Sequence, residues 1–164
     1  MAGIPNFRSA LNLQKAERST KPPVLPKPAR PSAKQGLRYE AKVERELASL
    51  SARGLFSQVE RTPWFDFADS LGSSCCAPDF VLHQPGGAII VIEVKLTWVP
   101  VALPKLRQLY IPVVSKALHS NVIFPLVIVK NLTPDAPPAE FTLSRALASK
   151  SCLLYWPDNG PMQW

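Results

Sequence analysis

The most regular pattern of apolar and polar positions lies between residues 77 and 97, where two apolar runs flank a turn signal. Phe80–Leu82 form the first run, Pro85-Gly86-Gly87 form the turn signal, and Ala88–Leu96 form the second run. The second run is rich in β-branched residues and almost continuously apolar, as in a strand buried on both faces. The pattern predicts a β-hairpin at the centre of the chain.

Two segments carry apolar residues at helical spacing. Residues 36–52 have an apolar stripe and are followed by Gly54, a residue suited to end a helix. Residues 103–119 have a second stripe, with Pro104 in the first turn, where proline is favourable. Pro112 lies inside this second helix, where we expect it to produce a kink.

The remaining segments complete an α/β pattern. The sequence predicts a strand over 55–67, a loop over 68–76, a strand over 122–129, a Pro-rich turn over 131–139, a helix over 141–150 and a strand over 152–156. The expected order is α-β-β-β-α-β followed by α-β. This order fits a mixed β-sheet with helices on both faces.

Length and composition fit one globular domain without disulfides or membrane spans. The chain has 164 residues, of which 46% are hydrophobic, enough for a sizeable core. Its three cysteines do not form a disulfide framework, which favours a reducing compartment. There is no long apolar run and no signal-peptide pattern. We therefore expect a cytoplasmic protein (the host-cell cytoplasm, if it is phage-encoded) with no membrane partner.

The positive charge is concentrated at the N-terminus. The net charge is +7, and residues 1–35 hold seven Lys and Arg side chains, one acid and six prolines. This composition predicts a disordered, basic, Pro-rich arm over 1–35, with a weak helical tendency over 7–18, followed by a domain over 36–164. A basic arm of this kind favours binding to nucleic acid, and the alternative is a tail that only aids solubility.

Three charged residues interrupt the apolar hairpin. Glu93 and Lys95 are two positions apart in a strand, so their side chains share one face, and Asp79 falls opposite them if the hairpin is antiparallel. Buried carboxylates need compensation, which Mg²⁺ or Mn²⁺ would provide, while the lysine orients a water or neutralises a phosphate. The alternative is an ion pair at the end of a sheet, with Glu93 and Lys95 reaching solvent.

Further acids lie in the first predicted helix and in the loop before the hairpin. Glu40 borders the apolar stripe of the helix and can reach a site at the end of the sheet, whereas a solvated charge pattern fits Glu44 and Glu46 better. Asp66 and Asp69 are spare acids, which we interpret as loop residues.

The hairpin and the first helix together resemble the PD-(D/E)XK nuclease superfamily. The matching residues are Pro78-Asp79 and Glu93-Val94-Lys95. Gly36-Leu37-Arg38-Tyr39-Glu40, followed by Val43 and Leu47, resembles the first helix of archaeal-type Holliday junction resolvases and of phage junction-resolving endonucleases. The similarity spans about residues 36–130. It implies a restriction-endonuclease-like core.

The resemblance also implies a reaction and a set of roles. Asp79, Glu93 and the backbone carbonyl of Val94 would bind Mg²⁺ or Mn²⁺, Glu40 would join the metal site, and Lys95 would position the attacking water. The reaction would be in-line hydrolysis of a DNA phosphodiester, with branched DNA in recombination or repair as the expected substrate. Enzymes of the resolvase type usually act as homodimers.

Basic residues in the arm and in both predicted helices are the candidates for contacts with DNA: Arg30, Lys34, Arg38, Lys105 and Arg107. Two other functions remain open from the sequence. One is a non-catalytic DNA-binding or structural protein on a nuclease-like scaffold, because folds are reused without their activity. The other is a restriction-type nuclease that reads a short DNA sequence.

Overall fold

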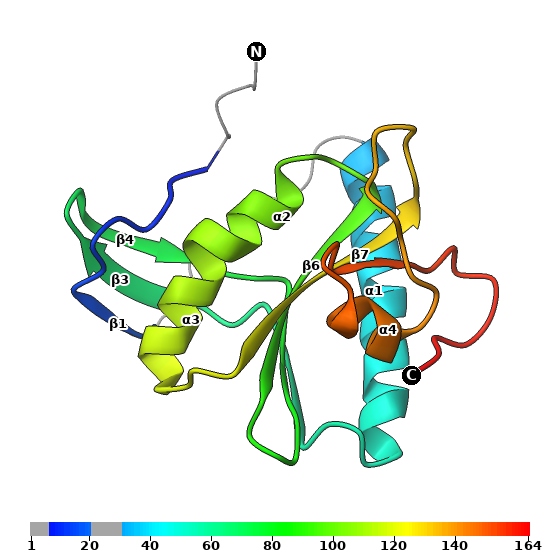
Figure 1. The fold of residues 1–164 in the computed structure, drawn as a ribbon, viewed down its shortest axis with the longest axis horizontal. Coiled ribbons are helices and arrows are strands. Elements are labelled where there is room, and N and C mark those ends of the chain that lie inside the picture. Colours follow the sequence, from blue (N-terminus) through cyan, green and yellow to red (C-terminus); the bar gives the residue numbers. More distant parts are fainter. Residues whose placement is uncertain (1–6, 21–30) are drawn as a thin grey trace.

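The computed structural model describes residues 7–20 and 31–164, which form helices packed on both faces of a mixed sheet (Figure 1). The strands are β1 (Lys15–Arg18), β2 (Gln58–Arg61), β3 (Phe65–Asp69), β4 (Gly72–Cys76), β5 (Phe80–His83), β6 (Ile89–Thr97), β7 (Ile123–Asn131) and β8 (Leu153–Tyr155). The helices are α1 (Pro31–Ala52), α2 (Ala102–Lys105), the π-helical turn η1 (Leu106–Tyr110), α3 (Ile111–Leu118) and α4 (Leu143–Ala148).

The central sheet has five strands in the order β2-β5-β6-β7-β8. β2, β5 and β6 are antiparallel neighbours, whereas β7 runs parallel to β6 and β8 runs parallel to β7. The β5–β6 hairpin closes where the sequence predicts it, with Gly87 at a φ of 90°, in the left-handed region that glycine tolerates. The predicted α/β class with a mixed sheet is therefore confirmed.

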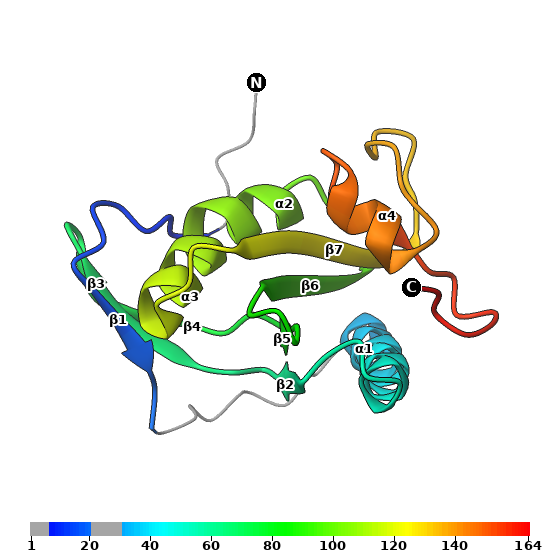
Figure 2. The ribbon, with the colours of Figure 1, turned by 60° about the horizontal axis from the view of Figure 1, so that its bottom comes forward.

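Helix α1 covers one face of the central sheet (Figure 2). Val43, Leu47 and Leu50 are buried against Phe80, Ile92 and other residues of the sheet, as the apolar stripe predicts. Leu37, the first residue of the predicted stripe, is exposed instead, and Tyr39 is buried in its turn of the helix. The helix begins five residues before the predicted start, at Pro31, which suits a first turn because it needs no hydrogen-bond acceptor for an N–H. It ends before Gly54, whose φ of 86° confirms the predicted stop.

Helices α2 and α3 cover the opposite face and join through η1 into one continuous rod. Just before Pro112 the rod contains the π-helical turn, in which the N–H of Ile111 donates to the carbonyl of Leu106, five residues back. Pro112 has no N–H to donate to the carbonyl of Gln108. That carbonyl instead accepts a hydrogen bond of 3.0 Å from the backbone N–H of Ala10.

The segment predicted as one strand over 55–67 is divided between two sheets. β2 belongs to the central sheet, whereas β3 pairs with β1 and β4 in a second sheet of three strands. Thr62 has a φ of 47° and precedes Pro63, so the strand cannot continue through this point. The predicted loop over 68–76 is also wrong, because β4 pairs with β3 from Phe65 to Asp69.

The prediction of a disordered arm over 1–35 is wrong for the described part of that range. β1 pairs with β3, and Phe7, Ala10, Leu13 and Ala16 pack against the core beside α3. Burial of these small and apolar side chains lowers the free energy more than formation of the isolated helix expected over 7–18, because a short helix is marginally stable in water. Residues 31–35 belong to α1. The rest of the predicted arm lies outside the described residues.

Candidate active site

The sheet brings Asp79, Glu93 and Lys95 together at the open end of the β5–β6 hairpin, away from the turn. Phe80 pairs with Ile92, so the preceding residue Asp79 lies beside Glu93 at the end of the ladder. The Oδ2 atom of Asp79 accepts a hydrogen bond of 2.6 Å from the backbone N–H of Val94. The Nζ atom of Lys95 lies 2.6 Å from Oε1 of Glu93. The convergence that strand alternation predicts is therefore confirmed.

Glu93 is the most buried charged residue in the described part of the chain, with 1% of its surface exposed. Its Oε1 atom contacts both Lys95 and Lys105, the latter at 3.1 Å. Its Oε2 atom is buried and has no hydrogen-bond partner among the described residues. A buried carboxylate oxygen without a partner is costly, so this atom is available to a cation or to a polar ligand atom.

The second carboxylate, on Asp79, resists ionisation. Burial raises the pKa of Asp79 to about 7, the nearby Glu93 carboxylate adds to the rise, and the N–H of Val94 opposes it. The repulsion between the two carboxylates that contributes to this rise is one that a divalent cation would relieve. The two carboxylates, one of which has the unpartnered Oε2 atom of Glu93, fit Mg²⁺ or Mn²⁺, which bind to oxygen ligands and retain several waters.

Lys95 keeps its charge in this environment. Burial opposes the charged form, but the Glu93 carboxylate beside it raises the pKa of Lys95 overall. The side chain retains 33% of its exposure, so the ammonium group borders solvent. It can hold and orient a water molecule or a phosphate oxygen that approaches Glu93.

Helix α2 adds a second lysine that the hairpin pattern does not reveal. Lys105 reaches Glu93, and its Nζ atom lies 4.8 Å from the centre of the Tyr110 ring. Tyr110 is buried, and burial together with the charge of Glu93 raises the pKa of its hydroxyl. The sequence indicated Lys105 only as a phosphate contact. A charged residue on the otherwise apolar face of a helix was the signal for its place in the site.

Glu40 lies near the trio but is bound to a different partner. Its Oε1 atom is 3.7 Å from Nε of Arg61, whose Nη1 atom reaches Glu44. Burial raises the pKa of Glu40, Arg61 opposes this rise, and the charge of Glu93 adds to it. Within residues 7–20 and 31–164, no three acidic, histidine or cysteine side chains are grouped so that they could hold a metal ion. Among the described acids, Asp79 and Glu93 are therefore the two carboxylates of the candidate site, and Glu40 is not grouped with them closely enough to complete a set of three metal ligands.

The spare acids before the hairpin have different roles. The Asp69 side chain is buried and accepts hydrogen bonds from Arg8 and from the backbone N–H groups of Leu11 and Leu71. It therefore fixes the N-terminal segment on β3, and the interpretation of Asp69 as a loop residue is wrong. Asp66 is exposed, and it too lies in β3 rather than in a loop.

The residues predicted to contact DNA are spread over several surfaces. Lys34 and Arg38 are exposed on α1, while Lys105 is bound to Glu93. Arg107 is exposed, and its Nη2 donates to the carbonyl of Lys150 at 3.0 Å. Arg30 lies outside the described residues. In the arm, Arg8 and Arg18 already form ion pairs with Asp69 and Glu60, so fewer of its charges are available to DNA than the composition indicates.

Comparisons of this chain with protein-family models, with curated proteins and with solved structures give no match. In the described part of the chain, no helix has both the length and the apolar character needed to span a membrane.

Proposed function

We propose that this protein is a metal-dependent DNA endonuclease of the PD-(D/E)XK type. The observation that carries the proposal is the state of Glu93, a buried carboxylate with two ammonium groups at one oxygen and no partner at the other. Asp79 lies next to it with a pKa raised to about 7. Two carboxylates and two lysines at one point of an apolar sheet suit the hydrolysis of a phosphodiester.

Each residue has a role in this proposal. Asp79, Glu93 and the carbonyl of Val94 would hold Mg²⁺ or Mn²⁺. When bound, the metal supplies stabilisation of the charge that develops on the phosphate and a lowered pKa for a bound water. Lys95 orients the attacking water against the phosphorus, because its ammonium is fixed by Glu93 and borders solvent. Glu40 supports the site from α1.

The arrangement of the sheet supports the resemblance found in the sequence. Around the central sheet the chain runs α1, β2, β5, β6, the α2–α3 rod and β7, with β2–β5–β6 antiparallel and β7 parallel to β6. This is the α-β-β-β-α-β order expected of a restriction-endonuclease-like core. In this proposal the β3–β4 hairpin would be an insertion between the first two strands of that core.

The substrate in this proposal is DNA, and branched DNA in particular. The net charge of +7 favours a polyanion, and the match of α1 with the first helix of junction-resolving enzymes favours a four-way junction. A homodimer would place two such sites on the paired strands of a junction. A restriction-type nuclease would instead cut linear duplexes at a short sequence.

One observation favours a second candidate, a non-catalytic DNA-binding or structural protein. Lys95 and Lys105 already balance the charge of Glu93, so the site is compensated without a metal. In that case the trio would be an ion-pair cluster within the fold, and its removal would affect stability rather than catalysis.

A cleavage assay separates these candidates. The purified protein is incubated with Mg²⁺ and with linear, nicked, forked and four-way DNA. We expect cleavage, fastest on the four-way substrate, that is lost in Glu93→Gln. Asp66→Asn is the matched control, because Asp66 is an exposed carboxylate on β3. Absence of Mg²⁺-dependent cleavage on every substrate would favour the non-catalytic candidate, and site-specific cutting of linear DNA would favour the restriction type.

A further inference from the structure

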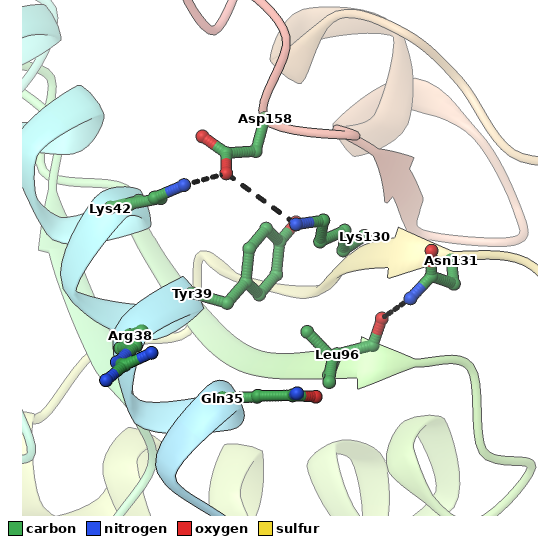
Figure 3. Close-up of a pocket in the computed structure, with 8 residues that line it drawn as sticks. All are labelled: Gln35, Arg38, Tyr39, Lys42, Leu96, Lys130, Asn131 and Asp158. Atoms are coloured by element: carbon green, nitrogen blue, oxygen red, sulfur yellow. Dashed lines mark hydrogen bonds and ion pairs between the residues drawn. The ribbon is translucent and has the colours of Figure 1, made fainter. Parts of the chain in front are cut away.

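A basic groove lies beside α1, at the ends of β6 and β7 (Figure 3). It has a volume of about 370 Å³, and we define it by the polar residues Gln35, Arg38, Lys42, Lys130, Asn131 and Asp158. Three of these side chains are cations, and one is an acid. None of the six belongs to the trio of the candidate active site, and of the six only Arg38 was indicated by the sequence.

Asp158 occupies the groove as an internal anion. Its Oδ2 atom accepts a hydrogen bond from Lys42, and Nζ of Lys130 lies 3.8 Å from the same oxygen (Figure 3). The two lysines come from α1 and β7, and Asp158 comes from the loop that follows β8. One anionic oxygen shared by two ammonium groups is also the arrangement in which lysines bind a phosphate oxygen.

The loop that carries Asp158 is anchored independently of these ion pairs. The hydroxyl of Tyr39 donates to the carbonyl of Trp156 at 2.8 Å, and the two rings stack with their centres 5.8 Å apart. Trp156 also donates from Nε1 to the carbonyl of Gly160 at 3.0 Å. The chain on both sides of Asp158 therefore stays in place if its carboxylate leaves the lysines.

The groove retains donors that Asp158 does not use. Arg38 and Gln35 are exposed, and neither side chain makes a hydrogen bond or an ion pair within residues 7–20 and 31–164. Arg38 in particular offers several N–H donors in the fork geometry that suits phosphate oxygens. The groove thus holds more positive charge than its one acid neutralises.

The groove adjoins the candidate active site through β6. Leu96 lines the groove, and it directly follows Lys95, whose side chain lies on the opposite face of the strand. On α1, Glu40 lies next to Arg61 of β2, whereas Lys42 lies next to Asp158. The helix therefore has an acidic flank toward the trio and a basic flank toward the groove.

We propose that this groove binds a backbone phosphodiester of a nucleic-acid strand, and that Asp158 holds the place of that phosphate in the free protein. The inference rests on the proposed function for the identity of the ligand. A phosphate that enters displaces the Asp158 carboxylate from Lys42 and Lys130 and gains Arg38 as an additional donor. Because a phosphate must displace this carboxylate, Asp158 weakens the binding of any strand that does not place a phosphate in the groove.

The test is the affinity for a fluorescein-labelled single-stranded oligonucleotide, measured by anisotropy in EDTA so that no cleavage occurs. Asp158→Asn should bind about fivefold more tightly, because a unit charge about 4 Å away is worth about 1 kcal/mol in water. The double variant Lys42→Ala, Lys130→Ala should bind more weakly and lower the slope of log K against log salt by about 0.7 for each lost contact. Lys116→Ala, an exposed lysine on α3, is the matched control and should change neither.

Two results would overturn the inference. One is an unchanged affinity in both Asp158→Asn and the lysine double variant, with melting temperatures that show folded protein. The other is displacement of the oligonucleotide by the same concentration of inorganic phosphate in wild type and in the double variant. This result would place the phosphate-binding site outside the groove. The binding assay contains no metal and does not depend on cleavage. If the cleavage assay shows no nuclease activity, the binding assay still tests whether the groove binds a nucleic-acid strand.

Discussion

Lys105 and Glu93 are joined across two elements, with Nζ of Lys105 3.1 Å from the same Glu93 oxygen that Lys95 approaches to 2.6 Å. One lysine comes from the strand of the hairpin, and the other comes from the helix that covers it. Under the proposed function, a metal at Glu93 would compete with both ammonium groups for this carboxylate. The released ammonium group would then be able to contact the phosphate.

Replacement of Lys105 by methionine tests whether it is this second phosphate contact. Lys105→Met keeps most of the side-chain volume but removes the charge, and we expect kcat to fall about 100-fold, as for loss of one preorganised donor in a transition state. Single-turnover cleavage at saturating DNA separates this from a change in KM. The control is Lys116→Met on α3. An unchanged kcat in Lys105→Met would assign Lys105 to a purely structural ion pair.

The raised pKa of Asp79 predicts an unusual pH dependence of stability in the absence of metal. The folded protein keeps this proton up to a pH of about 7, whereas the unfolded chain releases it near the ordinary value of 3.8. The unfolded state thus binds fewer protons between these values, so the free energy of unfolding should fall as pH rises from 3.8 to about 7. Urea unfolding in EDTA across this range should show the slope.

Asp79→Asn should remove most of that slope and raise the stability at pH 7, because the asparagine carries no charge next to Glu93. Lys95 does not mask the effect, because its raised pKa adds stability that is lost only above its ordinary value of 10.5. Mg²⁺ should bind more tightly as pH rises toward 7, since it competes with the Asp79 proton. Equal slopes in wild type and Asp79→Asn would contradict the assigned pKa.

Much of the site follows from sequence because it depends on strand alternation. Glu93 and Lys95 share a face in any regular strand, and the glycine turn fixes the register that sets Asp79 beside them. The α/β class follows from the periodicities in the same way. These features depend on local geometry, which a single sequence specifies.

The features that sequence did not predict depend on long-range contacts. Arg61 binds Glu40 from another element, and the role of Lys105 depends on how the α2–α3 rod crosses the sheet. The strand β1 forms only because β3 offers a free edge, and the π-helical turn forms where the N-terminal segment supplies Ala10 as a donor. The charge of Lys105 beside the apolar stripe is a local signal for a buried partner, but no local pattern identifies which residue that partner is.

Glu40 and Glu44 share Arg61, so a pair of variants on α1 tests which acid serves the site. We expect Glu40→Gln to reduce Mg²⁺-dependent cleavage strongly, because its carboxylate is close enough for the charge of Glu93 to raise its pKa. Glu44→Gln should have little effect, since 38% of its side chain is exposed and it only neutralises Arg61. The reverse order of activities would show that Glu44, and not Glu40, serves the site.

The N-terminal segment should be required for stability. Deletion of residues 1–20 removes β1 and exposes the apolar surface that Phe7, Leu13 and Ala16 cover beside α3. We expect a lower melting temperature by calorimetry, and Arg8→Ala should lower it in the same direction by leaving Asp69 without its ion pair. A truncated chain that melts at the wild-type temperature would show that the segment adds nothing to the fold.

The central claim is that Asp79, Glu93 and Lys95 form one metal-dependent hydrolytic site. The most direct test measures the DNA cleavage rate as a function of Mg²⁺ concentration in wild type, Asp79→Asn and Lys95→Ala. We expect a saturable rate in wild type, a rate lower by orders of magnitude with weaker Mg²⁺ dependence in Asp79→Asn, and no cleavage in Lys95→Ala at any Mg²⁺ concentration. Full cleavage by Lys95→Ala, or the same Mg²⁺ dependence in Asp79→Asn as in wild type, would contradict this account.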